Sequence, residues 1–141
     1  MLILDTNVLI SGIIKGKVLD IIFELYDKGV KLFCPQLVLE EIKFKLLIIS
    51  KQSKLSEEAV LFFFSNLFSE FVKPIPKEEY EEFISEAKRI SPHLKDAPLF
   101  ALSLSFDKAP IWSREPRLKR QSFVNVLNDE DVEEVCDIKL E

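Results

Sequence analysis

LILDTN, residues 2–7, begins with three apolar residues, Leu2 to Leu4, which are followed by the acidic Asp5. Three consecutive apolar residues before Asp5 are too few for a helix and are typical of a short buried strand. A strand that is apolar throughout, without alternation, is typical of the centre of a parallel sheet. The segment therefore predicts a central strand over residues 2–4, with Asp5 at its carboxyl end.

Strand-like and helix-like patterns alternate along the rest of the chain. This alternation predicts a parallel sheet of four to five strands covered by helices on both faces, a three-layer α/β/α sandwich of Rossmann type. With 141 residues and no repeat or linker, we expect a single domain over residues 1–141. Further strands are expected at residues 31–34, 70–72, 110–112 and 123–127, and helices at 18–28, 36–49, 56–69, 77–90, 96–106 and 129–135.

The composition restricts the classes of partner. Apolar residues make up 48% and charged residues 30% of the chain, which is typical of a soluble globular protein. A net charge of −5 excludes nucleic-acid binding through the overall field of the molecule, so such a role needs a local basic patch or metal ions. Cys34 and Cys136 lack a CxxC spacing and are expected as reduced thiols in a cytoplasmic protein. No signal peptide or membrane-spanning stretch is expected.

Three acidic positions lie where parallel-sheet proteins carry their working residues, at strand ends and at the helix starts facing them. They are Asp5, one of the adjacent Glu40 and Glu41, and Asp96. Neighbouring helix residues point about 100° apart, so only one of the two glutamates can face the sheet edge. Each position also has a structural interpretation, because the aspartates suit helix N-caps and a helical glutamate is usually solvated. The residues alone leave both interpretations open.

Several kinds of site are excluded by what the sequence lacks. His93 is the only histidine and has no partner at zinc-ligand spacing. The glycine-rich nucleotide loops and the GxSxG nucleophile motif are absent. The Asp-x-Asp pattern of a phosphatase is broken by Asn7.

Four segments in order resemble the motifs of the PIN-domain family, the fold of the VapC-type toxin ribonucleases. They are ILDTNVL (residues 3–9), residues 35–46, DAPLFAL (residues 96–102) and APIWSRE (residues 109–115), with Leu118, Lys119 and Arg120 trailing. The resemblance covers nearly the whole chain. In the second segment it selects Glu41 rather than Glu40 as the acidic site residue.

The resemblance implies an acidic pocket that binds a divalent metal ion and cleaves RNA. Converging carboxylates repel one another, and a hard cation such as Mg²⁺ or Mn²⁺ relieves that repulsion. Asp5 and Asp96 are then the primary metal ligands, Glu41 binds directly or through water, and Glu115 is a supporting or second-metal ligand. Three further residues would orient these groups by hydrogen bonds: Thr6, Asn7 and Ser113.

The fourth segment departs from the family pattern of Thr-x-Asp, often followed by another Asp two residues later. This chain has Ser113, Glu115 and Arg117 at those positions. The extra methylene of glutamate moves the carboxylate by about 1 Å, and a misplacement of that size can cost about 100-fold in rate. The resemblance therefore implies either a metal-dependent endoribonuclease, such as the toxin of a toxin–antitoxin pair, or a catalytically weakened PIN-like domain that binds RNA or a protein.

Basic residues beside the fourth segment are expected either to contact the phosphates of single-stranded RNA or to form a solvated loop. Trp112 is expected in the strand core, with base stacking as the alternative. The contact candidates are Arg114, Arg117, Lys119 and Arg120, with Lys43, Lys45 and Lys95 near the other segments.

Residues 46–49 and 61–64, together with Leu67, Phe68 and Phe71, carry more apolar surface than one helix face buries. They predict a thick core, a homodimer interface or a groove for a partner such as an antitoxin segment, and we favour the homodimer.

Overall fold

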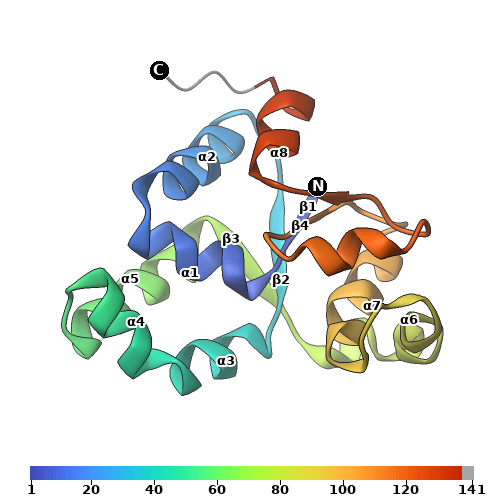
Figure 1. The fold of residues 1–141 in the computed structure, drawn as a ribbon, viewed down its shortest axis with the longest axis horizontal. Helices are drawn as coiled ribbons and strands as arrows, with labels where there is room; N and C mark the ends of the chain where they lie inside the picture. The colour runs from blue at the N-terminus through green and yellow to red at the C-terminus, as the bar shows by residue number, and fades with distance from the viewer. Residues whose placement is uncertain (138–141) are drawn as a thin grey trace.

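A five-stranded parallel sheet forms the centre of the fold in the computed structural model, which describes residues 1–137 (Figure 1). The strand order is β3-β2-β1-β4-β5, so β1 lies in the middle and pairs with β2 on one side and β4 on the other. The α/β prediction is confirmed. The strands are β1 (Leu2–Leu4), β2 (Leu32–Pro35), β3 (Val72–Ile75), β4 (Ile111–Trp112) and β5 (Val126–Leu127).

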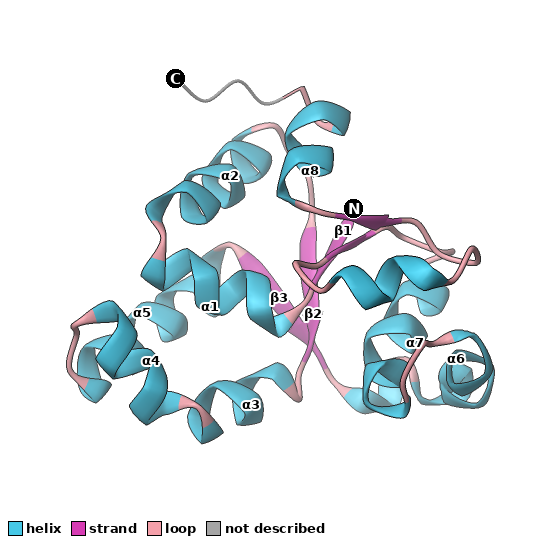
Figure 2. Ribbon diagram, viewed as in Figure 1, coloured by secondary structure: helices cyan, strands magenta, loops and turns pink. Residues whose placement is uncertain are grey.

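Helices cover both faces of the sheet, as expected for a three-layer sandwich (Figure 2). The first face carries α1 (Thr6–Ile14), α2 (Gly16–Asp27), α3 (Val38–Phe44), α4 (Leu46–Ser53), α5 (Glu57–Glu70) and α8 (Asp129–Val135). The second face carries α6 (Ile84–Ile90), α7 (Ala97–Ser105) and the 3₁₀ turns η1 (Lys77–Glu79), η2 (Glu81–Phe83), η3 (Leu94–Asp96) and η4 (Pro116–Arg120).

Alternate strand residues point into the two layers of the core. In β1, Leu2 and Leu4 pack with the first group of helices, whereas Ile3 packs with the second. In β4, Trp112 and Ile111 divide in the same way. Both faces of the central strands are therefore buried, which explains why these strands are apolar at every position.

Several predicted elements differ in the structure. Residues 6–14 form α1, where no element was predicted from the sequence. The predicted helix at 36–49 is broken at Lys45 into α3 and α4, and the predicted helix at 77–90 contains two 3₁₀ turns before α6. The strand expected at 70–72 lies instead at Val72–Ile75 and contains Pro74, which is tolerated because β3 is an edge strand.

The apolar segments at 46–49 and 61–64 are divided between core and surface. Ile49 and Phe64 are buried in the core, whereas Leu47, Ile48 and Phe62 are exposed. The thick-core interpretation therefore explains only part of this apolar surface. Both cysteines are free thiols. Within residues 1–137, no helix has the length and apolar character that crossing a membrane requires.

Candidate active site at the carboxyl edge of the sheet

The carboxyl ends of the neighbouring strands β1 and β4 lie side by side. The order in which the chain adds strands reverses direction between these two strands. From β1 the chain adds β2 and β3 on one side, then returns to place β4 and β5 on the other. Open parallel sheets bind ligands in the crevice at such a switch point. Asp5 follows β1 and Ser113 follows β4, so the fold puts both at this place.

Asp5 is fixed by hydrogen bonds from both neighbouring segments. Its Oδ1 accepts a hydrogen bond from the Thr6 backbone N–H at 2.8 Å, and its Oδ2 accepts one from the Ser113 hydroxyl at 2.7 Å. The Ser113 oxygen in turn accepts a hydrogen bond from the Glu115 N–H at 3.0 Å. Asp5 is thus both the N-cap of α1 and a side chain oriented across the strand ends. The cap interpretation and the site interpretation are compatible.

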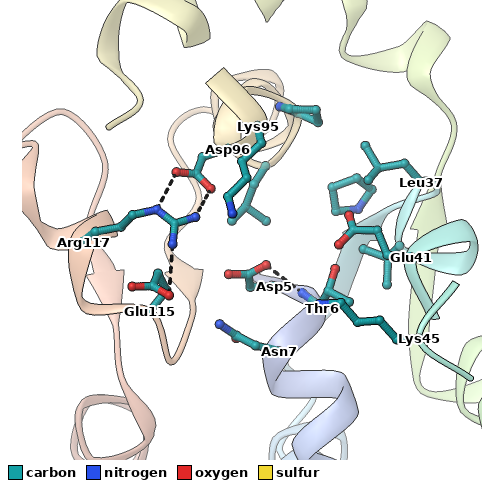
Figure 3. Close-up of a pocket in the computed structure, with 14 residues that line it drawn as sticks. Asp5, Thr6, Asn7, Leu37, Glu41, Lys45, Lys95, Asp96, Glu115 and Arg117 are labelled. Carbon is teal, nitrogen blue, oxygen red and sulfur yellow. Dashed lines mark hydrogen bonds and ion pairs between the residues drawn. The ribbon is translucent and has the colours of Figure 1, made fainter. Parts of the chain in front are cut away.

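One cavity of about 460 Å³ brings together all four predicted acidic residues (Figure 3). Asp5 comes from the end of β1, Glu41 from α3, Asp96 from η3 and Glu115 from the loop after β4. Glu40 does not line the cavity, so the choice of Glu41 agrees with the geometry. Further lining residues are Thr6, Asn7, Lys45, Lys95 and Arg117.

Burial makes two of these carboxylates unfavourable in their charged form. It raises the pKa of Asp5, and the hydrogen bonds from Ser113 and Thr6 oppose this rise only in part. Burial likewise raises the pKa of Glu41. The hydrogen bond with the Thr6 side chain opposes this rise, and the nearby charge of Asp5 adds to it. The cavity therefore has the electrostatic character of a site that gains from a cation.

Arg117 supplies positive charge inside the cavity. Its Nη2 lies 2.8 Å from Asp96 Oδ1 and its Nε lies 3.3 Å from Asp96 Oδ2, while Nη1 lies 3.0 Å from Glu115 Oε2. Figure 3 shows the guanidinium between these two carboxylates. From the sequence, Arg117 was one of the basic residues expected either to contact RNA phosphates or to form a solvated loop; in the structure its guanidinium points at the acidic residues.

The other basic residues after β4 are mostly paired within the protein. Arg114 hydrogen-bonds Ser11 and pairs with Asp129 at 3.4 Å, and Lys119 pairs with Asp131 at 2.6 Å. Within residues 1–137, Arg120 has no such partner and is exposed. Asn7 Oδ1 accepts a hydrogen bond from the Arg114 N–H at 3.2 Å, so Asn7 ties α1 to the loop after β4.

A family model of the PIN domain matches residues 3–121. The chain belongs to the PIN-domain family. PIN domains are generally nucleases that use divalent metal ions. No curated protein and no solved structure matches the chain. The family match supports a nuclease-type site in general terms, without indicating a particular substrate.

The side chains of this PIN domain suit a divalent metal by their chemistry but not by their present arrangement. Four carboxylates line the cavity, and oxygen donors are the ligands that Mg²⁺ and Mn²⁺ prefer. Within residues 1–137, however, no three acidic, histidine or cysteine side chains are grouped so that they could hold one ion. Both oxygens of Asp96 are already bonded to Arg117. As arranged here, the site does not fit a metal ion.

Two features of this PIN domain were missed from the sequence. One is the ion pairing of Arg117 with Asp96, which lies 21 positions away and gives no local signal. The other is Asp129, which accepts a hydrogen bond from the Trp112 indole N–H at 2.9 Å. Trp112 is fully buried, so the base-stacking alternative is wrong and the core alternative is confirmed.

Proposed function

We propose that this protein is an endoribonuclease that cleaves phosphodiester bonds of single-stranded RNA with the help of Mg²⁺ or Mn²⁺. The observation that carries the proposal is that Asp5, Glu41, Asp96 and Glu115 line one cavity at the carboxyl edge of the sheet. When bound to carboxylates, a divalent cation neutralises developing charge and lowers the pKa of a water molecule. Asp5 and Asp96 are the proposed main ligands, with Glu41 and Glu115 supporting them, in an arrangement in which Arg117 has released Asp96.

The surroundings of the cavity support an anionic substrate. Lys45 and Lys95 line it beside the carboxylates, so their ammonium groups are available to phosphate oxygens. Arg120 is exposed at the end of η4, the element that also carries Arg117. We propose these three residues as the main phosphate contacts, with Arg114, Arg117 and Lys119 contributing when their internal ion pairs open.

The proposed activity is tested with purified protein and a fluorescently labelled single-stranded RNA. We expect cleavage with Mg²⁺ or Mn²⁺, none with EDTA, and a loss of at least about 100-fold in rate for Asp5→Asn. Asp20→Asn, on the exposed side of α2, is the matched control and is expected to cleave like the wild type. Cleavage that persists in Asp5→Asn would identify a contaminating nuclease and end the proposal.

A second candidate function is favoured by the position of Arg117. The Arg117 guanidinium is paired with Asp96 and Glu115, so these carboxylates are already neutralised without a metal ion. The second candidate is therefore a weakened PIN domain that binds RNA or a protein without cleaving RNA. Glu115→Asp separates the two candidates. An inert wild type together with cleavage by Glu115→Asp would favour the binding function, whereas cleavage by the wild type excludes it.

We also propose that the protein acts as a homodimer and that it is the toxin of a toxin–antitoxin pair. The dimer rests on the exposed apolar side chains of α4 and α5. The toxin role rests on the family resemblance and on the proposed ribonuclease activity. It predicts growth arrest when the chain is expressed alone, with relief in the Asp5→Asn variant.

A further inference from the structure

Arg117 is bonded to three carboxylate oxygens of the candidate site. Three of its nitrogens each lie within 3.3 Å of an oxygen of Asp96 or Glu115. The Asp96 side chain is nearly buried, so its negative charge is poorly solvated and needs a cationic partner. The planar guanidinium fork matches a carboxylate better than any other side chain does.

These contacts use the groups that a metal ion would need. Of the four acidic residues, Asp96 and Glu115 are paired with Arg117, and Asp5 has both oxygens hydrogen-bonded to Thr6 and Ser113. Glu41 is not paired with Arg117, and its carboxylate is hydrogen-bonded by the Thr6 side chain. A divalent cation held by Asp96 or Glu115 would therefore have to displace the guanidinium from that carboxylate.

We propose that Arg117 is an internal cation that neutralises Asp96 and Glu115 in place of a divalent ion, so that metal binding by these carboxylates and their ion pairs with Arg117 exclude each other. This inference rests on the proposed function for its set of ligands. Arg117 then sets the metal concentration at which the site fills. It is a determinant of metal affinity and not a metal ligand.

The test is the affinity for Mn²⁺ alone, measured by isothermal titration calorimetry on the whole chain. We expect Arg117→Gln to bind Mn²⁺ at least about 10-fold more tightly than the wild type, which corresponds to about 1.4 kcal/mol. Arg89→Gln is the matched control, because it removes the same charge from an exposed position on α6. Its Mn²⁺ affinity is expected to equal that of the wild type.

Thermal unfolding with EDTA and with Mn²⁺ gives a second readout that does not depend on activity. Removing Arg117 leaves the buried Asp96 without its partner, so Arg117→Gln is expected to melt below the wild type in EDTA. Mn²⁺ is expected to raise its melting temperature more than that of the wild type, because only the folded protein holds the ion tightly.

Arg117→Lys keeps the test decisive if Arg117→Gln fails to fold. Lysine retains the charge but has one nitrogen, which cannot reproduce three separate contacts to Asp96 and Glu115. Its Mn²⁺ affinity is expected to lie between those of the wild type and Arg117→Gln. Equal affinity in the wild type and in every folded Arg117 variant would overturn the inference.

The outcomes distinguish this inference from the proposed function. If wild type and variants bind Mn²⁺ equally, the inference falls while a metal-dependent nuclease stands. If Arg117→Gln binds more tightly but no form of the protein cuts RNA, the inference stands and the ribonuclease proposal falls. If no form binds Mn²⁺, the inference and the metal dependence both fall.

Discussion

Asp5 combines a structural role and a proposed chemical role in one side chain. It caps α1 and is held by Ser113 from the neighbouring strand, yet burial still raises the pKa of its carboxyl group. In the metal-free protein, the folded state therefore keeps the Asp5 proton to a higher pH than the unfolded chain does. Over that pH range the unfolded chain binds fewer protons, so this residue lowers the free energy of unfolding as the pH rises.

Asp5→Asn removes this pH-dependent cost. In EDTA, we expect the wild type to lose unfolding free energy relative to Asp5→Asn as the pH rises from the ordinary aspartate pKa towards neutrality. The asparagine variant has no carboxyl group to titrate at this position. Urea unfolding at a series of pH values measures it. Asp20→Asn serves as the control for removing one acidic charge at an exposed position. Parallel stability curves for Asp5→Asn and the wild type would contradict the prediction.

The sequence predicted which acidic residues meet but not how they are bonded. Strand ends and the helix starts that face them follow from the alternation of strands and helices, which is why Asp5 and Asp96 were identifiable as candidates. Glu41 needed the family resemblance, because a helical glutamate carries no local signal. The direction of the Arg117 side chain depends on the path of η4 after β4, which no pattern in residues 113–120 determines.

Element prediction succeeded where the period of the apolar pattern was clear and failed where tertiary contacts decide. The central strand and the final helix at 129–135 match β1 and α8. Helix α1 was missed because residues 6–14 are rich in β-branched residues and contain Gly12, which disfavour a helix in isolation. Its buried Val8 and Leu9 pack into the core and offset that preference. The break at Lys45 has no proline or glycine to mark it.

Helix α8 is bonded to β4 and to the residue that follows Ser113, within the fourth segment (residues 109–115). Asn128 and Asp131 form a capping box at its start, and Asp129 in its first turn bonds the buried Trp112 indole and pairs with Arg114. The residues after β4 are therefore held from both sides, by Asn7 of α1 and by Asp129 of α8. These contacts to Arg114 and Trp112, on either side of Ser113, help to position the Ser113 hydroxyl beside Asp5.

Asp129→Ala is expected to destabilise the protein by about 1–3 kcal/mol, because it leaves a buried indole N–H without an acceptor. Urea unfolding measures the change. The same substitution in a Trp112→Phe background is expected to cost less, since that variant has no N–H to satisfy. Glu130→Ala is the matched control in the first turn of α8, at an exposed position. An equal cost of Asp129→Ala in both backgrounds would assign its effect to the Arg114 ion pair alone.

At the scale of the whole molecule, exposed apolar side chains gather on consecutive elements of one layer. Phe44 at the end of α3 is 91% exposed, and Phe62 on α5 is 72% exposed. Leu47 and Ile48 on α4, between them in sequence, are also exposed. Single exposed apolar residues are normal on a monomer, whereas a run of them with aromatic members is typical of an interface. The division of this segment between core and surface was not predictable from its composition.

The dimer prediction is tested by replacing one side chain on each of two surfaces. We expect the wild type to sediment as a dimer and Phe62→Glu to sediment as a monomer, because a charge buried in an apolar interface is unfavourable. Phe123→Glu is the matched control: Phe123 is 57% exposed and precedes β5, at the sheet edge opposite β3, the strand that α5 contacts. It is expected to remain dimeric. A monomeric wild type would contradict the dimer prediction. If Phe123→Glu dissociates the dimer and Phe62→Glu does not, the interface lies at the β5 edge instead.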